Sequence, residues 1–475
     1  MARSIGAFGT FGTWRRNTFA ALNDGHFRVL FIGTLFATFA YMMMFLAMSV
    51  VSYDLSGTNT AVGIIGTGVG LAMLLAPFGG VIADRMNRKW VIVIGQGGGA
   101  AMLALTGVLL LLGQMTLPLM FVLMLGLGFT FVVMGPARNA FTADLVGPHL
   151  IGNAIVLSQL SHTIGQPFSP FIAALLLESA AGSGGTYLVM GALVAVGVFT
   201  VAVMPNRRRQ GDPGAQEATA TGAQQPAQRR GVIADIVDGG RYVWRRPALR
   251  LMLLMFVSTV VIGFLFRILT PAFLDQHLDR PTTDMGQLFL VNGIAAAIIS
   301  FVVAGLATTR WAWPTTLLLV ASLGVGYFVL AASQTFGQAM IGMAILGPGL
   351  QGPVMILQAR IMMNTESAYY GRVMAFTMMA WGVQMVFAGP AGVLADAIGE
   401  REVFGMMGLA AFVVAILGTF GWLAIRKDDH PVLPSTLPAP ARAAASTNGA
   451  NGAAAPTMPP PPMLRPVALM SGQKD

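Results

Sequence analysis

A short run between two long apolar stretches of the chain reads GGVIADRMNRK, from Gly79 to Lys89. Two glycines open the run, an aspartate follows, and three basic residues close it. Small residues let a helix end approach a neighbouring helix closely. Asp84 is an anion of the kind that is stable beside a helix N-terminus. The run therefore predicts a tight, charged connection between two packed helices.

Apolar stretches of membrane-spanning length flank this run and recur along the chain. Of the 475 residues, 55% are hydrophobic and 10% are charged, whereas a soluble domain carries about 25% charged residues. A membrane helix needs roughly 20 predominantly apolar residues. We therefore predict an all-α membrane protein with twelve transmembrane helices, at residues 29–53, 60–82, 91–113, 117–136, 152–177, 184–204, 251–274, 286–307, 314–332, 336–358, 373–395 and 403–425.

Positive charges gather on one side of the predicted membrane. Of the 28 Lys and Arg residues, 25 lie in segments on the side of the N-terminus. Arg280 and Arg401 lie on the other side, and Arg267 lies inside a span. Because cytoplasmic loops retain Lys and Arg, we predict a multi-pass protein of the plasma (inner) membrane with both termini cytoplasmic. The net charge of +9 then favours membrane lipids as neighbours, and no nucleic acid.

The segments outside the spans divide the chain. Residues 205–250 are rich in Gln, Ala and Gly and predict a linker that ends in a helix on the membrane surface. The Pro- and Ala-rich tail predicts disorder. The predicted organisation is a cytoplasmic N-terminal segment 1–28, an N-terminal six-helix bundle 29–204, a cytoplasmic linker 205–250, a C-terminal six-helix bundle 251–425 and a disordered cytoplasmic tail 426–475.

The two halves resemble each other in sequence. Asp54 and Asp275 are 221 residues apart, and Arg138 and Arg360 are 222 apart. Six such pairs fall at offsets between 220 and 225, among them Gly80 with Gly305 and Arg85 with Arg310. Chance and shared topology are the alternative explanation. A parallel duplication predicts two bundles related by an axis along the membrane normal, as in transporters with rocking halves.

The run at 79–89 resembles the loop signature of the major facilitator superfamily, Gly-x-x-x-Asp-Arg-x-Gly-Arg-Arg/Lys. Asn87 stands where the signature has Gly, and we expect it to keep a left-handed turn, because Asn tolerates that backbone. The resemblance implies a latch that holds the two halves in the outward-open state. Alternatively, the basic run is only a stop-transfer anchor. The residues assigned to this latch and its repeat are Gly80, Asp84, Arg85, Arg88, Arg138, Arg310, Arg360 and Arg372.

Further motifs resemble the branch of this superfamily that includes bacterial enterobactin exporters and drug efflux carriers. They include the segment 136–146, Gly371-Arg372-Val373 and Gly389-Pro390-Ala391-Gly392. The fifth-span exporter motif, Gly-Pro followed by Gly, is degenerate at residues 165–170, which read GQPFSP. The resemblance implies export.

Two ionisable residues, His162 and Arg267, fall inside the predicted spans, and such residues are functional candidates. His162 lies near the midplane, in a polar stripe with Ser158 and Gln166. It can carry the coupling proton, or be a neutral histidine bonded to a neighbouring helix. Arg267 can snorkel to the surface, or recognise an anionic or polar group of a ligand.

Other polar and aromatic residues in the spans are candidates for the substrate path, although packing or lipid contact explains any one of them as well. Gln351 lies between Pro348 and Pro353, which predicts a bend in the tenth span. The 31 Met and 29 Phe suit an adaptable apolar pocket. The remaining candidates are Thr38, Tyr41, Asn292, Trp381 and Gln384.

The sequence thus predicts a secondary active transporter that exports amphipathic or hydrophobic small molecules, drug-like or siderophore-like, by alternating access and proton antiport. It would act as a monomer. A proton-coupled uptake symporter for a small nutrient is the alternative, and a lipid-handling membrane protein is a more distant one. The spans hold one His and no Asp or Glu, the chain has no Cys, and there is no nucleotide-binding loop. An enzyme, a metal site and a cofactor are therefore not expected.

Overall fold

The computed structural model describes residues 20–75, 87–146, 150–204, 232–366 and 369–425. Nearly all of these residues are helical, and none forms a strand. The helices are α2 (Gly25–Ser56), α3 (Asn59–Met73), α5 (Arg88–Leu111), α6 (Leu117–Val146), α7 (Ile151–Glu178), α8 (Gly182–Val203), α10 (Val232–Trp244), α11 (Pro247–Phe264), α12 (Phe266–Leu278), α13 (Met285–Val303), α14 (Ala312–Ala332), α15 (Phe336–Met363), α16 (Tyr370–Ile398) and α17 (Glu400–Ile425). Short 3-10 helices lie at Ala20–Asn23, Thr282–Asp284 and Leu306–Thr308.

The prediction of an all-helical membrane protein is confirmed. Within the described residues, nine helical segments are long and apolar enough to cross a membrane. The shorter apolar helices Asn59–Met73 and Leu117–Val132 coincide with the second and fourth predicted spans, and α7 coincides with the fifth. The full count of twelve spans stays a prediction.

Local side-chain caps explain where several helices begin. Asp24 accepts from the backbone amides of His26 and Phe27 at the start of α2, and Thr335 forms a capping box with Gln338 at the start of α15. Asn87 caps α5 by accepting from the Lys89 amide, with an extended backbone at φ −66°. The predicted left-handed turn at Asn87 is therefore wrong. Asn suits this position because its side-chain oxygen satisfies a free helix amide.

The seventh predicted span is interrupted at Leu265, where α11 ends and α12 begins. The hydroxyl of Tyr327 on α14 donates to the carbonyl of Ile262. In an uninterrupted helix that carbonyl accepts from the amide of residue 266. The break places Arg267 in the first turn of a separate helix. By contrast, α15 continues as one helix through Pro348 and Pro353, and the bend expected there stays a prediction.

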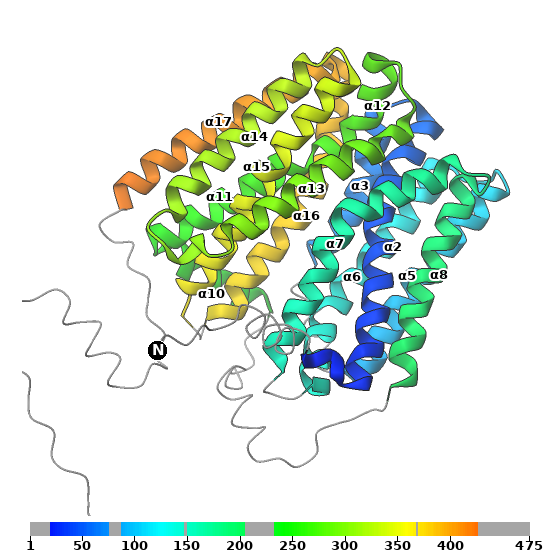
Figure 1. The fold of residues 1–475 in the computed structure, drawn as a ribbon, viewed down its shortest axis with the longest axis horizontal. Coiled ribbons are helices and arrows are strands. Elements are labelled where there is room, and N and C mark those ends of the chain that lie inside the picture. Colours follow the sequence, from blue (N-terminus) through cyan, green and yellow to red (C-terminus); the bar gives the residue numbers. More distant parts are fainter. Residues whose placement is uncertain (1–19, 76–86, 147–149, 205–231, 367–368, 426–475) are drawn as a thin grey trace, which may run out of the picture. The chain divides into compact units, whose positions relative to one another are not determined.

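The helices pack in two sets that follow the chain. In the first helix group, α2 packs on α7 and α8, α5 on α6 and α8, and α3 on α6. In the second helix group, α14 packs on α15 and α17, α13 on α15, and α11 on α15, α16 and α17. Between the groups, α3 lies against α16, α7 against α13, and α12 against α2 and α3 (Figure 1).

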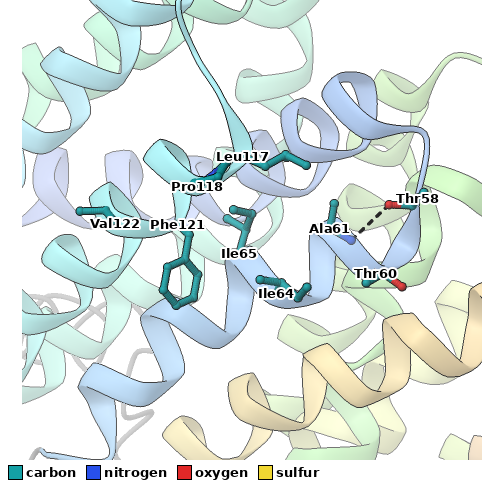
Figure 2. A pocket seen from close by; sticks show the side chains of 9 residues that line it. All are labelled: Thr58, Thr60, Ala61, Ile64, Ile65, Leu117, Pro118, Phe121 and Val122. Atoms are coloured by element: carbon teal, nitrogen blue, oxygen red, sulfur yellow. Dashed lines mark hydrogen bonds between the residues drawn. The ribbon is translucent and has the colours of Figure 1, made fainter.

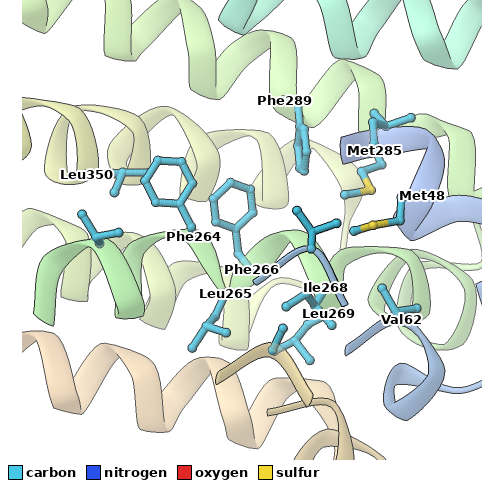
Figure 3. Close-up of a cluster of buried hydrophobic side chains, with 14 of the residues drawn as sticks. Met48, Val62, Phe264, Leu265, Phe266, Ile268, Leu269, Met285, Phe289 and Leu350 are labelled. Carbon is cyan, nitrogen blue, oxygen red and sulfur yellow. The ribbon is translucent and has the colours of Figure 1, made fainter. Parts of the chain in front are cut away.

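Buried apolar side chains continue from one group into the other. Figure 3 shows Met48 of α2 and Val62 of α3 beside residues of α12 and α13. Phe264, Phe266 and Phe289 form the aromatic part of this cluster. One apolar cluster therefore extends across both groups.

Candidate functional site

Five acidic residues lie together at one end of the helices: Asp54 of α2, Glu178 of α7, Asp275 of α12, Asp396 of α16 and Glu400 of α17. We call this the acidic end. Each of the five accepts a hydrogen bond from the other helix group. The carboxylates of this end therefore join the two groups.

Asp396 makes the densest set of these bonds. Its carboxylate accepts from the backbone amides of Asn59 (2.8 Å) and Thr60 (2.8 Å) and from the Asn59 side chain (3.0 Å). Asn59 and Thr60 open α3, and the first amides of a helix have no partner within it. The second group thus provides both a cap and a counter-charge for a helix N-terminus of the first group.

A corresponding contact joins the end of α7, in the first group, to the segment before α13, in the second group. Glu178, at the end of α7, accepts from the Thr283 hydroxyl at 2.6 Å, just before α13. Thr282 donates to Asp54 at 3.2 Å, and Tyr53 donates to Asp275 at 3.0 Å. Asp54 and Asp275, paired by the sequence repeat, thus each accept a hydroxyl hydrogen bond from the opposite group.

Glu400 is the most buried carboxylate of this end, with 2% of the residue exposed. It accepts from the Asn59 side chain at 2.5 Å, and its second oxygen lies 2.9 Å from Nε2 of His277 on α12. Buried carboxylates need such partners, because an unpaired buried charge is costly. Asn59 therefore binds two carboxylates of the second group at once.

Glycines extend this contact from the acidic end toward the middle of the helices. A methyl group added at Gly63 of α3 would clash with the backbone of Ala388, and one at Gly392 of α16 would clash with the backbone of Asn59. One added at Gly293 of α13 would lie 2.5 Å from Pro167 of α7. The absence of side chains lets the helices touch closely. We call these two contacts, α3 with α16 and α7 with α13, the glycine seams.

Arg267 lies near the middle of α11–α12, surrounded by aromatic rings. Its guanidinium carbon is 4.7 Å from the ring centre of Phe264, 5.6 Å from Phe289, and 6.0 Å from both Phe45 and Phe266. Its Nε is buried without a hydrogen-bond partner, and no carboxylate among the described residues pairs with it. Figure 3 shows three of the rings that form this cage. A charged group held only by ring faces retains its capacity to bind an anion.

One other predicted residue approaches this cage. Trp381 of α16 packs edge-on against Phe264, at 4.9 Å between ring centres. Gln384 lies one turn further along α16 and is buried. The structure thus brings Arg267 and Trp381 to the same phenyl ring.

The first group holds a separate cluster of predicted residues. Arg138 of α6 lies within electrostatic range of Tyr41 on α2 and of His162 on α7. The Nε of Arg138 is buried without a hydrogen-bond partner. His162 itself is exposed on the helix surface. These three side chains form a second polar centre, away from any carboxylate of the described spans.

The remaining path candidates make local contacts. Thr38 is buried beside Gly165, and Gln166 and Gln351 are half-buried. Ser158 donates to the Ala154 carbonyl of its own helix, and Asn292 donates to the Met343 carbonyl of α15. The last bond ties two helices of the second group together.

Much of the predicted latch lies outside the described residues, namely Gly80, Asp84 and Arg85. Arg88 opens α5, and Arg310 is exposed beside the ring of Trp311. Arg360 lies over the ring of Trp313 at 5.7 Å, and Arg372 pairs with Asp238 at 2.6 Å. We call this opposite end of the helices, together with α10, the basic end.

A hollow of about 520 Å³ opens between α3 and α6, near the acidic end. It is lined by Ile64, Ile65, Phe121 and other apolar side chains, with Thr58 and Thr60 at its edge (Figure 2). None of the residues singled out from the sequence lines it.

Sequence reasoning missed the role of the acidic end. It did not single out the acidic residues there as contacts between the groups, and it left His277, Asn59 and Thr283 unmentioned. The signal was present in the repeat, because Asp54 and Asp275 occupy matching positions at the ends of matching spans.

Comparisons with known proteins agree with this architecture. The sequence profile of the Major Facilitator Superfamily matches residues 30–389. The enterobactin exporter EntS of Shigella boydii serotype 18 is 26% identical over 422 residues, covering 87% of this chain and 93% of the relative. The enterobactin exporter EntS of Escherichia coli O81 is 26% identical with the same coverage.

Solved structures with the same fold are more distant in sequence. The nucleoside transporter NupG aligns with a TM-score of 0.65 at 14% identity, covering 84% of this chain and 99% of that one. A bacterial homologue of the human lysosomal transporter Spinster, solved in an inward-facing and unoccupied conformation, aligns with a TM-score of 0.67 at 13% identity. It covers 86% of this chain and 98% of the homologue.

Proposed function

Because the chain belongs to the major facilitator superfamily, whose members are transporters and not enzymes, we propose that it exports amphipathic, anionic small molecules by alternating access. The observation that carries this proposal is the cage of four phenyl rings around Arg267, which has no carboxylate partner among the described residues. The rings offer apolar surface to the body of the substrate, and the guanidinium offers two-pronged hydrogen bonds to its anionic group.

The acidic end supports alternating access. Its bonds between the groups are hydrogen bonds from hydroxyls and amides to carboxylates at the rim of the helices. The partly exposed ones are individually weak, so they can break and re-form as the groups move. The glycine seams keep the groups in register at this end. The structure therefore suits a state that is closed at the acidic end.

The proposed direction of transport and the proposed coupling to protons rest on further observations. The relatives cited above are named enterobactin exporters, which supports export of a siderophore-like compound. His162, exposed on α7 within electrostatic range of Arg138, is our candidate for the coupling proton in an antiport cycle. The excess of Lys and Arg on one side supports a chain in the inner membrane with both termini in the cytoplasm. The chain would work as a monomer.

Everted membrane vesicles with an imposed pH gradient test the proposed function. We expect uptake of an anionic amphipathic compound into these vesicles, with a proton efflux that follows addition of the compound. If the compound is taken up only by right-side-out vesicles, the protein is an uptake symporter and the proposal of export is wrong. No flux of any compound in either orientation would overturn the transport cycle proposed here.

The role of Arg267 is tested with a matched pair of probes, 2,3-dihydroxybenzoate and uncharged catechol. For the intact chain we expect the carboxylate probe to raise the melting temperature more than catechol does. A hydrogen bond to a charged group contributes about 1.5–3 kcal/mol. The substitution Arg267→Gln should therefore lower the affinity for the carboxylate probe roughly tenfold to a hundredfold. The same variant should leave the protein folded, because it removes a buried charge that has no anionic partner. Equal responses of the variant and the intact chain would refute anion recognition by Arg267.

A further inference from the structure

The helix α10 (Val232–Trp244), which precedes the second helix group, presents two different faces. One face packs on α11 and α16, with Gly239 and Val243 buried. A methyl group added at Gly239 would lie 2.9 Å from the side chain of Arg372 and 3.3 Å from Phe376, both on α16. The opposite face is exposed.

The contacts of the packed face form what we call the strap. Asp238 pairs with Arg372 at 2.6 Å, and the rings of Tyr242 and Tyr369 stack at 4.0 Å with 9° between their planes. The Tyr242 hydroxyl accepts from the amide of Glu366 at 3.1 Å, and the Glu366 carboxylate pairs with Arg246. The strap therefore fixes α10 to the beginning of α16 through polar and aromatic contacts.

The exposed face of α10 is both basic and apolar. Residues 234, 237, 241, 244 and 245 are exposed and recur at helical spacing, so they share one side of the helix. Trp244 is 68% exposed and Val237 is 56% exposed, and Arg241 and Arg245 lie beside them. None of the five residues on this face is acidic. Aromatic, apolar and arginine side chains on one exposed face are typical of a helix that lies in a bilayer surface.

The position of α10 fits a membrane surface. Trp244 lies three residues before Pro247, which opens the membrane-spanning segment Pro247–Leu278. Arg250, in the first turn of that segment, lies over the Trp244 ring at 5.1 Å. Trp and Arg at the boundary of a span occupy the headgroup region of a bilayer. The exposed face thus lies at the depth of lipid headgroups.

From this geometry we propose that the exposed face of α10 binds anionic lipid headgroups of the leaflet at the basic end, and that the strap transmits this binding to the start of α16. Arg241 and Arg245 supply the charge complementarity, and Val237 and Trp244 insert among the acyl chains. Lipid binding steadies α10, and the strap in turn steadies residues 369–376. The lipid leaflet at this end therefore acts on the beginning of α16.

The experiment uses the full chain in vesicles of phosphatidylcholine alone and of phosphatidylcholine with about one third phosphatidylglycerol. Amide hydrogen exchange is measured at residues 369–376. We expect slower exchange in the anionic vesicles. Arg241→Gln with Arg245→Gln should abolish the difference, since each arginine near an anionic surface strengthens binding about fivefold. Arg310→Gln, an exposed arginine of the same end outside α10, should keep the difference and serves as the matched control.

Two more arms separate binding from transmission. Bromine-labelled anionic lipid should quench the fluorescence of Trp244, measured as the signal lost in Trp244→Phe. Asp238→Asn with Tyr242→Leu breaks the strap and should keep this quenching while removing the protection at 369–376. The proposal would be overturned if anionic vesicles still slowed hydrogen exchange at residues 369–376 fully in the double arginine variant. It would also be overturned if free inorganic phosphate slowed this exchange as much as the anionic vesicles do. No transported substrate is needed, so failure here is distinct from failure of the proposed transport activity.

Discussion

The acidic end and the basic end hold the molecule together in different ways. At the acidic end, Asp396, Glu400 and Glu178 all bind residues of the opposite helix group. At the basic end, the ion pairs between described residues, Arg372 with Asp238 and Arg246 with Glu366, join α10 and α16 or their adjoining loop within the chain's second half. Lys89 likewise donates to Met204 within the first group.

In the proposed transport cycle, this difference gives the two ends different tasks. Bonds between the groups have to break when one group moves against the other, whereas bonds within a group travel with it. In the proposed transport cycle, the acidic end is therefore the gate that is closed in this structure. The basic end carries contacts that preserve each group while the groups move. A change at the acidic end should shift the balance between conformations, and a change at the basic end should act locally.

The largest expected effect comes from a wedge in the glycine seam. Gly63→Val places a branched side chain against the backbone of Ala388 and Gly389, and backbone atoms cannot move aside as a flexible side chain does. Overpacking of this kind costs about 1–3 kcal/mol, so the closed acidic end should lose fivefold to more than a hundredfold in population. Spin labels on Leu55→Cys and Ala397→Cys, at exposed positions in opposite groups, report the distance across this end, and the chain has no native cysteine.

The control for the wedge is Gly97→Val on α5, where an added methyl group meets no atom within 4 Å. In this variant, the distance between the spin labels at positions 55 and 397 should match that in the chain with Gly97 intact. An unchanged distance in Gly63→Val would mean that the seam does not determine closure.

A smaller effect is expected when one carboxylate of the acidic end loses its charge. Asp396→Asn keeps the shape of the side chain but weakens three accepted hydrogen bonds. Because Asp396 is exposed, solvent screens much of the charge, and the loss should be roughly 1 kcal/mol, or about fivefold in the closed population. The same label pair measures it.

Asp279→Asn is the matched substitution at the same end. Asp279 is exposed, its side chain makes no hydrogen bond within the described part of the chain, and its backbone is left-handed, φ 49°, which Asn also favours. We expect no change in the label distance. A response to Asp279→Asn as large as that to Asp396→Asn would show that only the net charge of this end matters.

The sequence predicted the framework of the fold because membrane helices follow from apolar length alone. Each of the twelve predicted stretches coincides with a helix or with the pair α11–α12. The break at Leu265 could not be foreseen, since it depends on a hydroxyl of α14, sixty-five residues away from the carbonyl that it binds. The structure of Asn87 was misjudged for a related reason, because a cap depends on where the next helix begins.

The site was harder to predict than the fold. His162 and Arg267 were found because a charge within a span is conspicuous. The phenyl cage around Arg267 draws its rings from α2, the α11–α12 pair and α13, and no spacing in the sequence brings them together. The contacts of Asn59 with Asp396 and Glu400 connect residues more than 330 positions apart. Such pairs arise from packing between groups, which periodicity does not report.

The smallest effect is expected at the basic end. It tests whether a change at that end leaves the acidic end unaltered. Asp238→Asn breaks the ion pair with Arg372, whose two side chains are 32% and 23% exposed, so the cost should be below about 1 kcal/mol. Since the bond joins α10 to α16 and does not cross to the first group, the distance between the labels at Leu55 and Ala397 should stay unchanged. Hydrogen exchange at residues 369–376 should become faster. A wider acidic end in this variant would contradict the division of tasks, because it would mean that a bond within the second half also keeps the opposite gate shut.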